Sequence, residues 1–317
     1  MSESAFQRLS SALTASYELH RELGGGGMSR VYLASDRADG REVVVKTLPV
    51  DIMSGDAVKR FKREIRTAST LKHPNIVPVL SAGEVEGSPY YTMPWVDGAS
   101  LRERIERGPL PLDEATSILR DMASALVAAH AKHVVHRDIK PENVLLSSGS
   151  ALITDFGVAR ALSAATLDGD TGGFQTGTGI AVGTPEYMAP EQFAADPSVD
   201  HRADLYAWGV VAYELLAAHH PFEGLIGPSL LKAHISETPR PLASFAPAVP
   251  ERIASIVAKC LEKDPDRRPR RAQDVVDVLE GRAVTGEWSR ATRRRAFVLA
   301  AFVVIALAAV VTALVLR

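Results

Sequence analysis

The sequence predicts an α+β protein in which strands dominate the first part of the chain and helices the rest. The pattern turns to alternation of apolar and polar residues from Tyr17, which suggests strands over 17–24, 30–36 and 42–48, and two more strands are expected near 77–82 and 89–93. Apolar residues recur at helical spacing over 54–72 and 112–133. With 317 residues, the chain is long enough for one large two-lobed domain or for two ordinary domains.

Bulk composition excludes several classes of protein. The formal charge of -2 provides no global field to attract nucleic acid, so no nucleic-acid partner is expected. The single cysteine, Cys260, excludes an internal disulfide framework and fits a reducing compartment. Residues 1–16 lack the apolar core of an export signal. Their apolar residues Phe6, Leu9 and Leu13 fit either a short helix packed on the first strands or a loose tail.

A glycine-rich turn and a lysine mark the first three strands. Gly24 to Gly27 connect the first two strands, and glycines let backbone amides approach phosphate oxygens. Such a run alone is more often only a flexible turn. Lys46 lies on the apolar third strand, where an unpaired charge would be costly, so an anionic partner is expected.

The next helix carries a candidate partner for that lysine. Glu64 lies beside the apolar face of 54–72, eighteen residues after Lys46. Alone, a glutamate in a helix so rich in Lys and Arg would usually be a solvated partner to its neighbours. Pro74 ends the helix. Met93 to Val96 then connects the strands to the helical part.

The stretch Val135 to Asn143 carries the most specific chemistry. It places Lys140 two residues and Asn143 five residues after Asp138, and Asp155-Phe156-Gly157 follows. One carboxylate can orient and accept the proton of an attacking hydroxyl, and a cation can meet the transferring phosphoryl group. An amide and a second carboxylate can hold magnesium. The alternative, a charged loop between two strands, does not account for all these residues at this spacing.

Together these motifs resemble those of the eukaryotic-type (Hanks-type) Ser/Thr protein kinase family, in particular its bacterial membrane-anchored members. The resemblance covers about 17–282 and implies the two-lobed protein kinase fold. The implied parts are an extension (1–16), a β-rich N-lobe (17–93), a hinge (94–98) and a helical C-lobe (99–282). It also implies ATP and Mg²⁺, with Mn²⁺ as an alternative, and protein substrates with Ser or Thr acceptors.

The resemblance assigns a role to each motif. Asp138 would act as the base or orienting group, Lys140 would stabilise charge, and Asn143 and Asp155 would hold the metal ion. Lys46 would bind the α- and β-phosphates and pair with Glu64 in the active state. The expected nucleotide-binding residues are Leu23, Gly24, Gly26, Val31, Lys46, Glu64, Pro94, Val96, Asn143 and Asp155.

Some positions depart from the family pattern. Ser29 stands at the usual third glycine, and Val44 where the family usually has Ala, which predicts a tighter adenine pocket. Pro94 stands where Glu is frequent, and proline removes only a donor that main-chain recognition of adenine through Pro94 and Val96 does not need.

The polar stretch 168–183 resembles a regulatory activation loop. Thr176-Gly177-Thr178 is similar to the paired phosphoacceptor site of bacterial relatives, and Thr171 is a further threonine nearby. Arg137 would receive the phosphate. The alternative is a polar loop with incidental threonines.

Further family contacts are expected around this loop. Thr184 is expected to bond Asp138 and Lys140, and Lys140-Pro141 resembles the Ser/Thr-specific form. In the C-lobe, Asp204 is expected to hold the catalytic loop backbone, and Arg268 to pair with Glu191.

The last segment predicts a membrane anchor. Residues 296–316 carry no charge and would span about 32 Å as a helix, close to a bilayer core of about 30 Å. The preceding linker, 283–295, is basic, which places the kinase domain on the cytoplasmic side of the cell membrane as a single-pass protein. Ala309 and Ala313 provide weak support for a homodimer. The alternative is a buried core helix.

Two other function classes compete with a protein kinase. A nucleotide-binding pseudokinase scaffold would usually lack one of Lys46, Asp138 and Asp155, and all three are present. A small-molecule phosphotransferase shares the phosphate chemistry, but its relatives lack Lys140-Pro141 and a segment like 183–191. Phosphoryl transfer to a generic protein, lost in an Asp138→Asn variant, would discriminate between the kinase and the scaffold.

Overall fold

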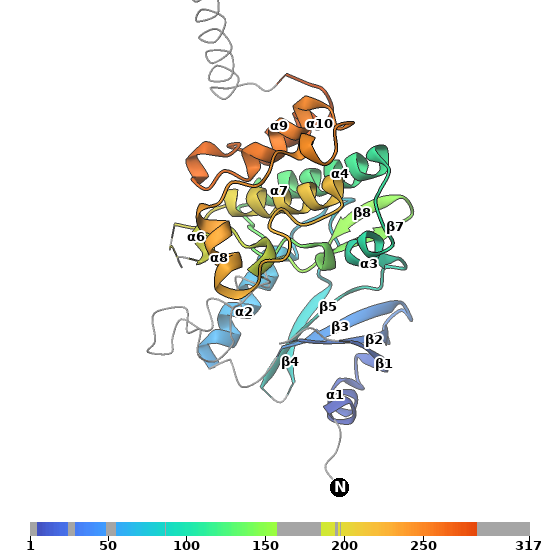
Figure 1. The fold of residues 1–317 in the computed structure, drawn as a ribbon. Helices are drawn as coiled ribbons and strands as arrows, with labels where there is room; N and C mark the ends of the chain where they lie inside the picture. Colours follow the sequence, from blue (N-terminus) through green and yellow to red (C-terminus); the bar gives the residue numbers. More distant parts are fainter. Residues whose placement is uncertain are drawn as a thin grey trace, which may run out of the picture.

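The structure is a computed structural model that describes residues 5–24, 29–48, 55–85, 87–156, 185–193, 196 and 198–283 (Figure 1). The chain forms the expected two lobes, a small one built on a sheet and a larger helical one. Several predictions lie outside the described residues. They concern the glycine-rich residues 25–27 (with Gly26), the threonines Thr171, Thr176, Thr178 and Thr184, the linker beyond 283 and the apolar segment 296–316.

The N-lobe is built on an antiparallel five-stranded sheet in the order β1-β2-β3-β5-β4. Its strands are β1 (Tyr17–Gly24), β2 (Arg30–Asp36), β3 (Glu42–Thr47), β4 (Ser81–Val85) and β5 (Ser88–Pro94). The first three agree with the predicted ranges. In the β3–β5 register Lys46 lies opposite Tyr91, so both side chains reach the same face of the sheet.

One predicted strand begins later than expected. A strand is predicted near 77–82, but β4 begins at Ser81. Pro78 has no N–H to donate to a neighbouring strand. The N–H of Val77 donates instead to the carbonyl of Ile153 in the C-lobe (2.9 Å). This stretch therefore connects the two lobes rather than extending the sheet.

The N-terminal extension forms a helix that packs on the sheet. Helix α1 (Ala5–Leu13) lies against β1 at the outer end of the N-lobe (Figure 1). Its buried residues Leu9 and Leu13 join an apolar cluster with Tyr17 and Tyr32. Of the two alternatives for residues 1–16, the packed helix is therefore confirmed. A helix this short would not be stable alone, and burial of its apolar face stabilises it.

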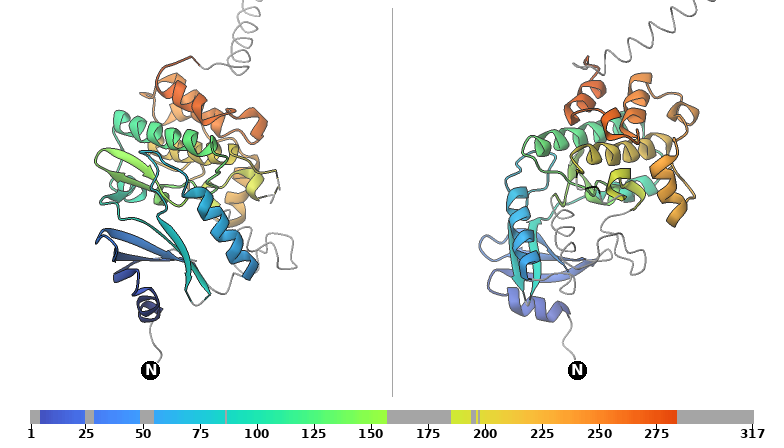
Figure 2. Two further views of the ribbon diagram at one scale, coloured as in Figure 1. Left: turned by 180° about the vertical axis from the view of Figure 1, so that it is seen from behind. Right: turned by 90° about the vertical axis from the view of Figure 1, so that its left-hand side faces the viewer.

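Helix α2 (Gly55–Ala68) packs along the sheet, as the views from behind and from the side show (Figure 2). Phe61 and Ile65 are fully buried with Leu48 and Tyr91. The helix is shorter than the predicted 54–72, since Ser69 and Thr70 form a turn in which both hydroxyls bond carbonyls of the last helical turn.

The C-lobe is built around two long helices, α4 (Leu112–His130) and α7 (Arg202–Ala217). Trp208 of α7 is fully buried and donates its indole N–H to the carbonyl of Leu119 (3.1 Å). A small sheet, in the order β6-β7-β8, lies on the side toward the N-lobe. The remaining elements are β6 (Ala99–Ser100), α3 (Leu101–Glu106), β7 (Val144–Ser147), β8 (Ser150–Ile153), α6 (Pro190–Phe193), α8 (Gly227–Ser236), α9 (Glu251–Cys260) and α10 (Ala272–Leu279).

Hydrogen bonds between the lobes fix the sheet of the N-lobe over the small sheet of the C-lobe. The amide of Asn75 donates to the carbonyl of Ala151 (2.9 Å), and the Ile153 N–H donates to the Asn75 carbonyl (2.9 Å). Ile76 and Ile153 form a parallel β-bridge. The strand that leads to Asp155 is therefore held directly by the N-lobe.

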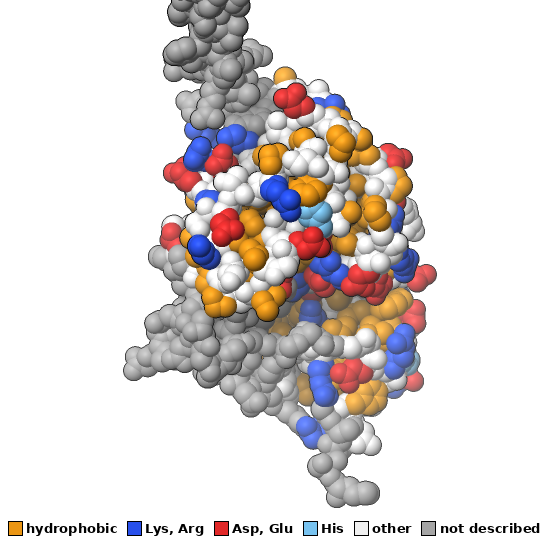
Figure 3. Space-filling view, in the orientation of Figure 1, with side chains coloured by type: hydrophobic (Ala, Val, Ile, Leu, Met, Phe, Trp, Pro, Cys, Tyr) orange, Lys and Arg blue, Asp and Glu red, His pale blue; other side chains and the backbone are white. Residues whose placement is uncertain are grey.

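The surface carries interspersed charges. On the face shown in Figure 3, Lys and Arg side chains lie among Asp and Glu side chains over both lobes. Among the described residues, no helix is long and apolar enough to span a bilayer.

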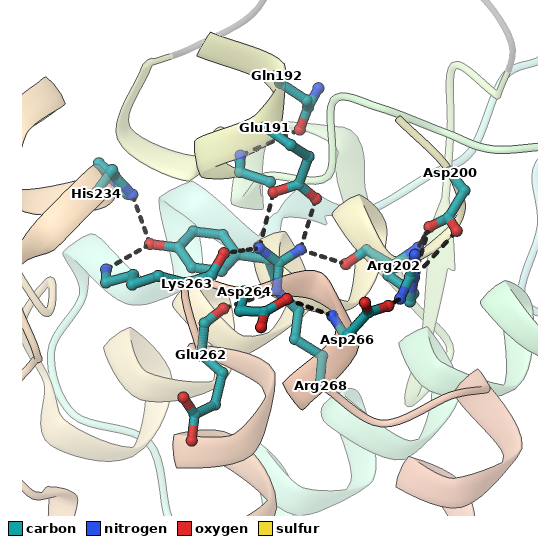
Figure 4. A network of polar contacts seen from close by, with 12 residues as sticks. Glu191, Gln192, Asp200, Arg202, His234, Glu262, Lys263, Asp264, Asp266 and Arg268 are labelled. Carbon is teal, nitrogen blue, oxygen red and sulfur yellow. Dashed lines mark hydrogen bonds and ion pairs between the residues drawn. The ribbon is translucent and has the colours of Figure 1, made fainter. Parts of the chain in front are cut away.

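The predicted ion pair between Arg268 and Glu191 is confirmed (Figure 4). Both Glu191 carboxylate oxygens accept from the guanidinium, at 2.6 and 2.8 Å. The Arg268 side chain is fully buried, and its other N–H groups donate to the carbonyls of Arg202, Glu262 and Lys263. This pair fixes α6, and with it the segment that ends at Glu191, to the C-lobe.

Candidate active site

Asp204 of α7 holds the backbone of the catalytic loop, the segment Val135 to Asn143, as predicted. The buried carboxylate accepts from the backbone N–H groups of His136 (2.9 Å) and Arg137 (2.8 Å) and lies 2.8 Å from Nε2 of His130. Arg137 has a φ of 70°, a left-handed conformation that is costly for a residue with a side chain. The hydrogen bonds that His136 and Arg137 donate to Asp204 stabilise that conformation, which orients the following Asp138.

Asp138, Lys140 and Asn143 form one hydrogen-bonded group. The Lys140 ammonium lies 2.9 Å from Oδ2 of Asp138. The amide of Asn143 donates to the same oxygen (3.0 Å) and to the main-chain carbonyl of Asp138 (2.8 Å). The Asp138 side chain is 22% exposed, so an incoming hydroxyl can reach it. The structure thus brings together the three residues proposed for catalysis.

Asp155 and Lys46 form a second group beside the first. The Lys46 ammonium donates to Oδ2 of Asp155 (2.8 Å), and the hydroxyl of Tyr91 donates to Oδ1 (2.5 Å). Burial alone would raise the pKa of Asp155, but Lys46 and the Tyr91 hydrogen bond outweigh it and hold that pKa below its ordinary value. Asp155 is therefore ionised and able to bind a cation. Its φ of 66° is again left-handed.

The expected pair between Lys46 and Glu64 is not among the ion pairs of the described residues. Lys46 pairs with Asp155, while the carboxylate of Glu64 lies 3.5 Å from the Arg63 guanidinium. The Glu64 side chain is only 13% exposed. The resemblance implies that the Lys46–Glu64 pair forms only in the active state, and in this conformation Lys46 pairs with Asp155 instead.

Main-chain contacts connect the two groups. The N–H of Thr154 donates to the carbonyl of Asn143 (3.0 Å), and Nε2 of His136 bonds the carbonyl of Thr154 (2.7 Å). Phe156 is buried against His136, with ring centroids 4.7 Å apart. The catalytic loop and the Asp155 segment are thus fixed relative to each other.

Four residues predicted to lie around the nucleotide, Leu23, Val31, Val44 and Val96, belong to one apolar cluster. Val44, Val77 and Met93 are its buried members. Packed against them are Leu23, Val31, Trp95, Val96, Leu145 and Leu152. The cluster contains side chains of both lobes and of the hinge, which is the composition that a flat heterocycle requires. Pro94 ends β5 next to this cluster, and Gly24, with a φ of 132°, ends β1.

Asn143 and Asp155 fit a magnesium ion. The side-chain nitrogen of Asn143 already donates twice to Asp138, so the side-chain oxygen Oδ1 of Asn143 remains as an acceptor. One amide oxygen and one ionised carboxylate suffice for Mg²⁺, because that ion takes its remaining ligands from water and phosphate. Among the described residues no cluster of three or more His, Cys, Asp or Glu could hold a metal without the nucleotide.

Several residues of the site are absent from the motif-based prediction. Tyr91 bonds Asp155, and His130 bonds Asp204. Tyr91 could have been found from the register, since it lies opposite Lys46 in the sheet. His130 ends α4 and carries no local signal, because its partner lies 74 residues away.

The fold and the paired acidic groups define a phosphotransferase with two lobes that contribute to one site. The chain belongs to the protein kinase family: residues 17–278 match the family described as "Protein kinase domain".

Curated relatives are bacterial Ser/Thr kinases. Serine/threonine-protein kinase PrkC of Bacillus subtilis is 39% identical over 267 residues, which cover 83% of this chain and 40% of the relative. Serine/threonine-protein kinase pkn2 of Myxococcus xanthus is 37% identical, with 84% and 32% covered. The chain thus spans less than half the length of these relatives. The crystal structure of the PknI kinase domain of Mycobacterium tuberculosis has a TM-score of 0.65 and 28% identity, and covers 85% of this chain and 96% of that one.

Proposed function

We propose that this protein is a protein Ser/Thr kinase that transfers the γ-phosphoryl group of ATP to hydroxyl groups of protein substrates. The observation that carries the proposal is the intact acidic centre: Asp138 lies with Lys140 and Asn143, and Asp155 lies with Lys46, in segments joined by hydrogen bonds. A pseudokinase scaffold would have no need to retain all five.

Each residue has a distinct task in the reaction. Asp138 would accept the proton of the attacking hydroxyl, and Lys140 would balance charge on the transferring phosphoryl group. Lys46, now on Asp155, would turn to the ATP phosphates, which leaves the Asp155 carboxylate for the metal. Asn143 and Asp155 would hold Mg²⁺, which when bound would neutralise charge on the phosphates. The apolar cluster around Val44 would hold the adenine ring.

A transfer assay tests this function. The purified protein is incubated with radiolabelled ATP, Mg²⁺ and a generic protein substrate, and the labelled residues are identified after hydrolysis. For the wild type, label is expected on Ser and Thr. The transfer rate of Lys46→Met should be lower by at least about a hundredfold, because a cation that holds the phosphates in place contributes to the rate on this scale. Transfer by Lys46→Met at the wild-type rate would contradict the nucleotide role.

Regulation by autophosphorylation is part of the proposal. Thr176 and Thr178 are the acceptor candidates, and Arg137, next to Asp138, would bind the resulting phosphate. Mass spectrometry of protein incubated with ATP and Mg²⁺ should find phosphate at Thr176 or Thr178, and the double Thr→Val variant should be several-fold less active. Phosphate in the Asp138→Asn variant would show that another kinase modified the loop.

Membrane attachment follows from the apolar segment 296–316 and the basic linker before it. Two such helices could pair through Ala309 and Ala313 and bring two kinase domains together. The full chain should fractionate with membranes, and removal of 290–317 should shift it to the soluble fraction with transfer activity retained. Membrane sedimentation of the shortened chain after a high-salt wash would contradict the anchor.

A further inference from the structure

The side chain of Tyr91 joins the sheet of the N-lobe to the carboxylate of Asp155. Tyr91 lies on β5, and its ring is fully buried beside Phe61 and Ile65 of α2. The ring centroids of Tyr91 and Phe61 are 6.4 Å apart. A tyrosine side chain has two torsion angles, so packing of the ring also fixes where the hydroxyl lies. That hydroxyl donates to Oδ1 of Asp155 (2.5 Å), 64 positions later in the chain.

The backbone of Asp155 is held separately from its carboxylate. The N–H of Ile153 donates to the carbonyl of Asn75 (2.9 Å), and the N–H of Thr154 donates to the carbonyl of Asn143 (3.0 Å). These bonds fix the main chain that leads into Asp155, but they leave its side-chain torsions free. The orientation of the carboxylate therefore depends on the groups that donate to its two oxygens.

The two oxygens of Asp155 have different donors. Lys46 donates to Oδ2 (2.8 Å) and Tyr91 to Oδ1 (2.5 Å). The hydroxyl of Thr154 lies 3.4 Å from Oδ1 and 3.1 Å from Sδ of Met93, and its one proton cannot serve both. In the proposed reaction Lys46 turns to the ATP phosphates. Among the described residues, Tyr91 is then the one close donor that stays on this carboxylate.

We propose that Tyr91 is a positioning residue for the metal ion: its hydroxyl holds Oδ1 of Asp155 and thereby reserves Oδ2 for Mg²⁺. The inference rests on the proposed kinase function for its effect on catalysis, whereas metal binding can be measured without transfer. Hydrogen bonds that orient the ligands of a metal ion typically contribute about 10- to 100-fold to metal affinity. Without the hydroxyl, the carboxylate can turn and offer both oxygens to Lys46, which competes with the metal ion.

Tyr91→Phe removes the hydroxyl and keeps the packed ring. The matched control is Tyr206→Phe, because Tyr206 of α7 is also fully buried and its hydroxyl bonds Nδ1 of His234 (2.9 Å). The second partner of that hydroxyl, Lys263, belongs to the same C-lobe network (Figure 4). Both variants remove one hydroxyl from the interior, and only Tyr91→Phe removes it from Asp155. If Tyr91→Phe does not fold, Tyr91→Met fills the position without a hydroxyl and serves in its place.

The first experiment measures metal binding without catalysis. Mn²⁺ is the probe, since it prefers the same oxygen ligands as Mg²⁺, and electron paramagnetic resonance measures free Mn²⁺ in the presence of protein and a non-hydrolysable ATP analogue. The Mn²⁺ affinity of Tyr91→Phe should be about 10- to 100-fold lower than that of the wild type, and that of Tyr206→Phe should be unchanged. Affinity for the analogue in EDTA should be the same for all three proteins.

Two results of this experiment would overturn the inference. An unchanged Mn²⁺ affinity in Tyr91→Phe would show that the hydroxyl does not position the metal ligand. A higher affinity would show that the hydroxyl competes with the metal ion for the carboxylate.

The second experiment measures transfer over a range of Mg²⁺ concentrations. The KM for Mg²⁺ of Tyr91→Phe should rise by about 10- to 100-fold, with a smaller fall in kcat. Tyr206→Phe should keep the wild-type KM for Mg²⁺. A purely structural role of Tyr91 would lower kcat and leave the KM for Mg²⁺ unchanged, and that result would overturn the inference.

The outcomes separate the two proposals. If Tyr91→Phe is active with the wild-type dependence on Mg²⁺, the positioning inference fails while the kinase function stands. If the wild type transfers no phosphoryl group to protein, the kinase function fails. The Mn²⁺ affinities would then still decide whether Tyr91 positions the metal ligand.

Discussion

An Asp138→Asn variant should transfer phosphoryl groups to protein about 10²- to 10⁴-fold more slowly than the wild type, the range that a positioned general base contributes. Asn keeps the size of the side chain and can still lie beside Lys140 and Asn143, but it cannot accept the proton of the attacking hydroxyl. ATP binding should persist, because Lys46 and Asp155 lie in the other group of the site. Initial rates with radiolabelled ATP and a fluorescent-nucleotide titration measure the two effects separately.

The matched control is Asp113→Asn, the same chemical change at an exposed position in the first turn of α4. Its rate should equal that of the wild type within experimental scatter. Since the Asp138 side chain is partly exposed, both variants should keep a cooperative unfolding transition. A fully active Asp138→Asn protein would refute the catalytic assignment. If the Asp138→Asn variant lost its cooperative unfolding transition together with its transfer rate, the lower rate would instead reflect a folding defect.

The order of elements could be predicted from local patterns because each pattern reports which residues are buried. The strand predicted over 42–48 corresponds to β3, and both faces of this strand are covered, since Val43, Val44 and Val45 are all buried. The helical spacing of 112–133 corresponds to α4. Boundaries were less predictable, since they depend on tertiary partners. Val77 bonds the C-lobe and not β5, and α1 is stabilised by packing on Tyr17 and Tyr32, which no local pattern shows.

The grouping of Asp138, Lys140 and Asn143 could be predicted because the three residues lie within one short motif. Contacts between residues distant in the chain could not be predicted in this way. Arg102 and Glu214 are 112 positions apart and meet only after α3 and α7 pack. The partner of Lys46 could not be read from the motif either: the resemblance implies Glu64, and in the structure the partner is Asp155.

An Asp204→Ala variant should lose about 3–5 kcal/mol of unfolding free energy, the cost of removing one member of a buried polar cluster. The N–H groups of His136 and Arg137 would lose their acceptor in the interior, and His130 would lose its partner. The left-handed φ of Arg137 would no longer be stabilised, so phosphoryl transfer should fall as well, although Asp204 does not touch the reacting groups. Denaturant unfolding and the transfer assay measure the two losses.

Asp200 provides the control, because it lies four residues earlier and pairs with Arg202 in a partly exposed position. Asp200→Ala should cost about 0–1 kcal/mol. The pH dependence is a further test. Burial opposes ionisation of Asp204, but the hydrogen bond and charge of His130 hold its pKa below the ordinary value of about 3.9.

A carboxyl group whose pKa is lowered in the folded state contributes stability above its unfolded pKa and loses that contribution as pH falls through the folded pKa. The stability difference between wild type and Asp204→Ala should therefore be constant from pH 7 down to about pH 4 and shrink below it. If the difference already declined between pH 7 and 5, a histidine rather than Asp204 would control this cluster. A loss no larger than that of Asp200→Ala would show that the catalytic loop keeps its conformation without Asp204.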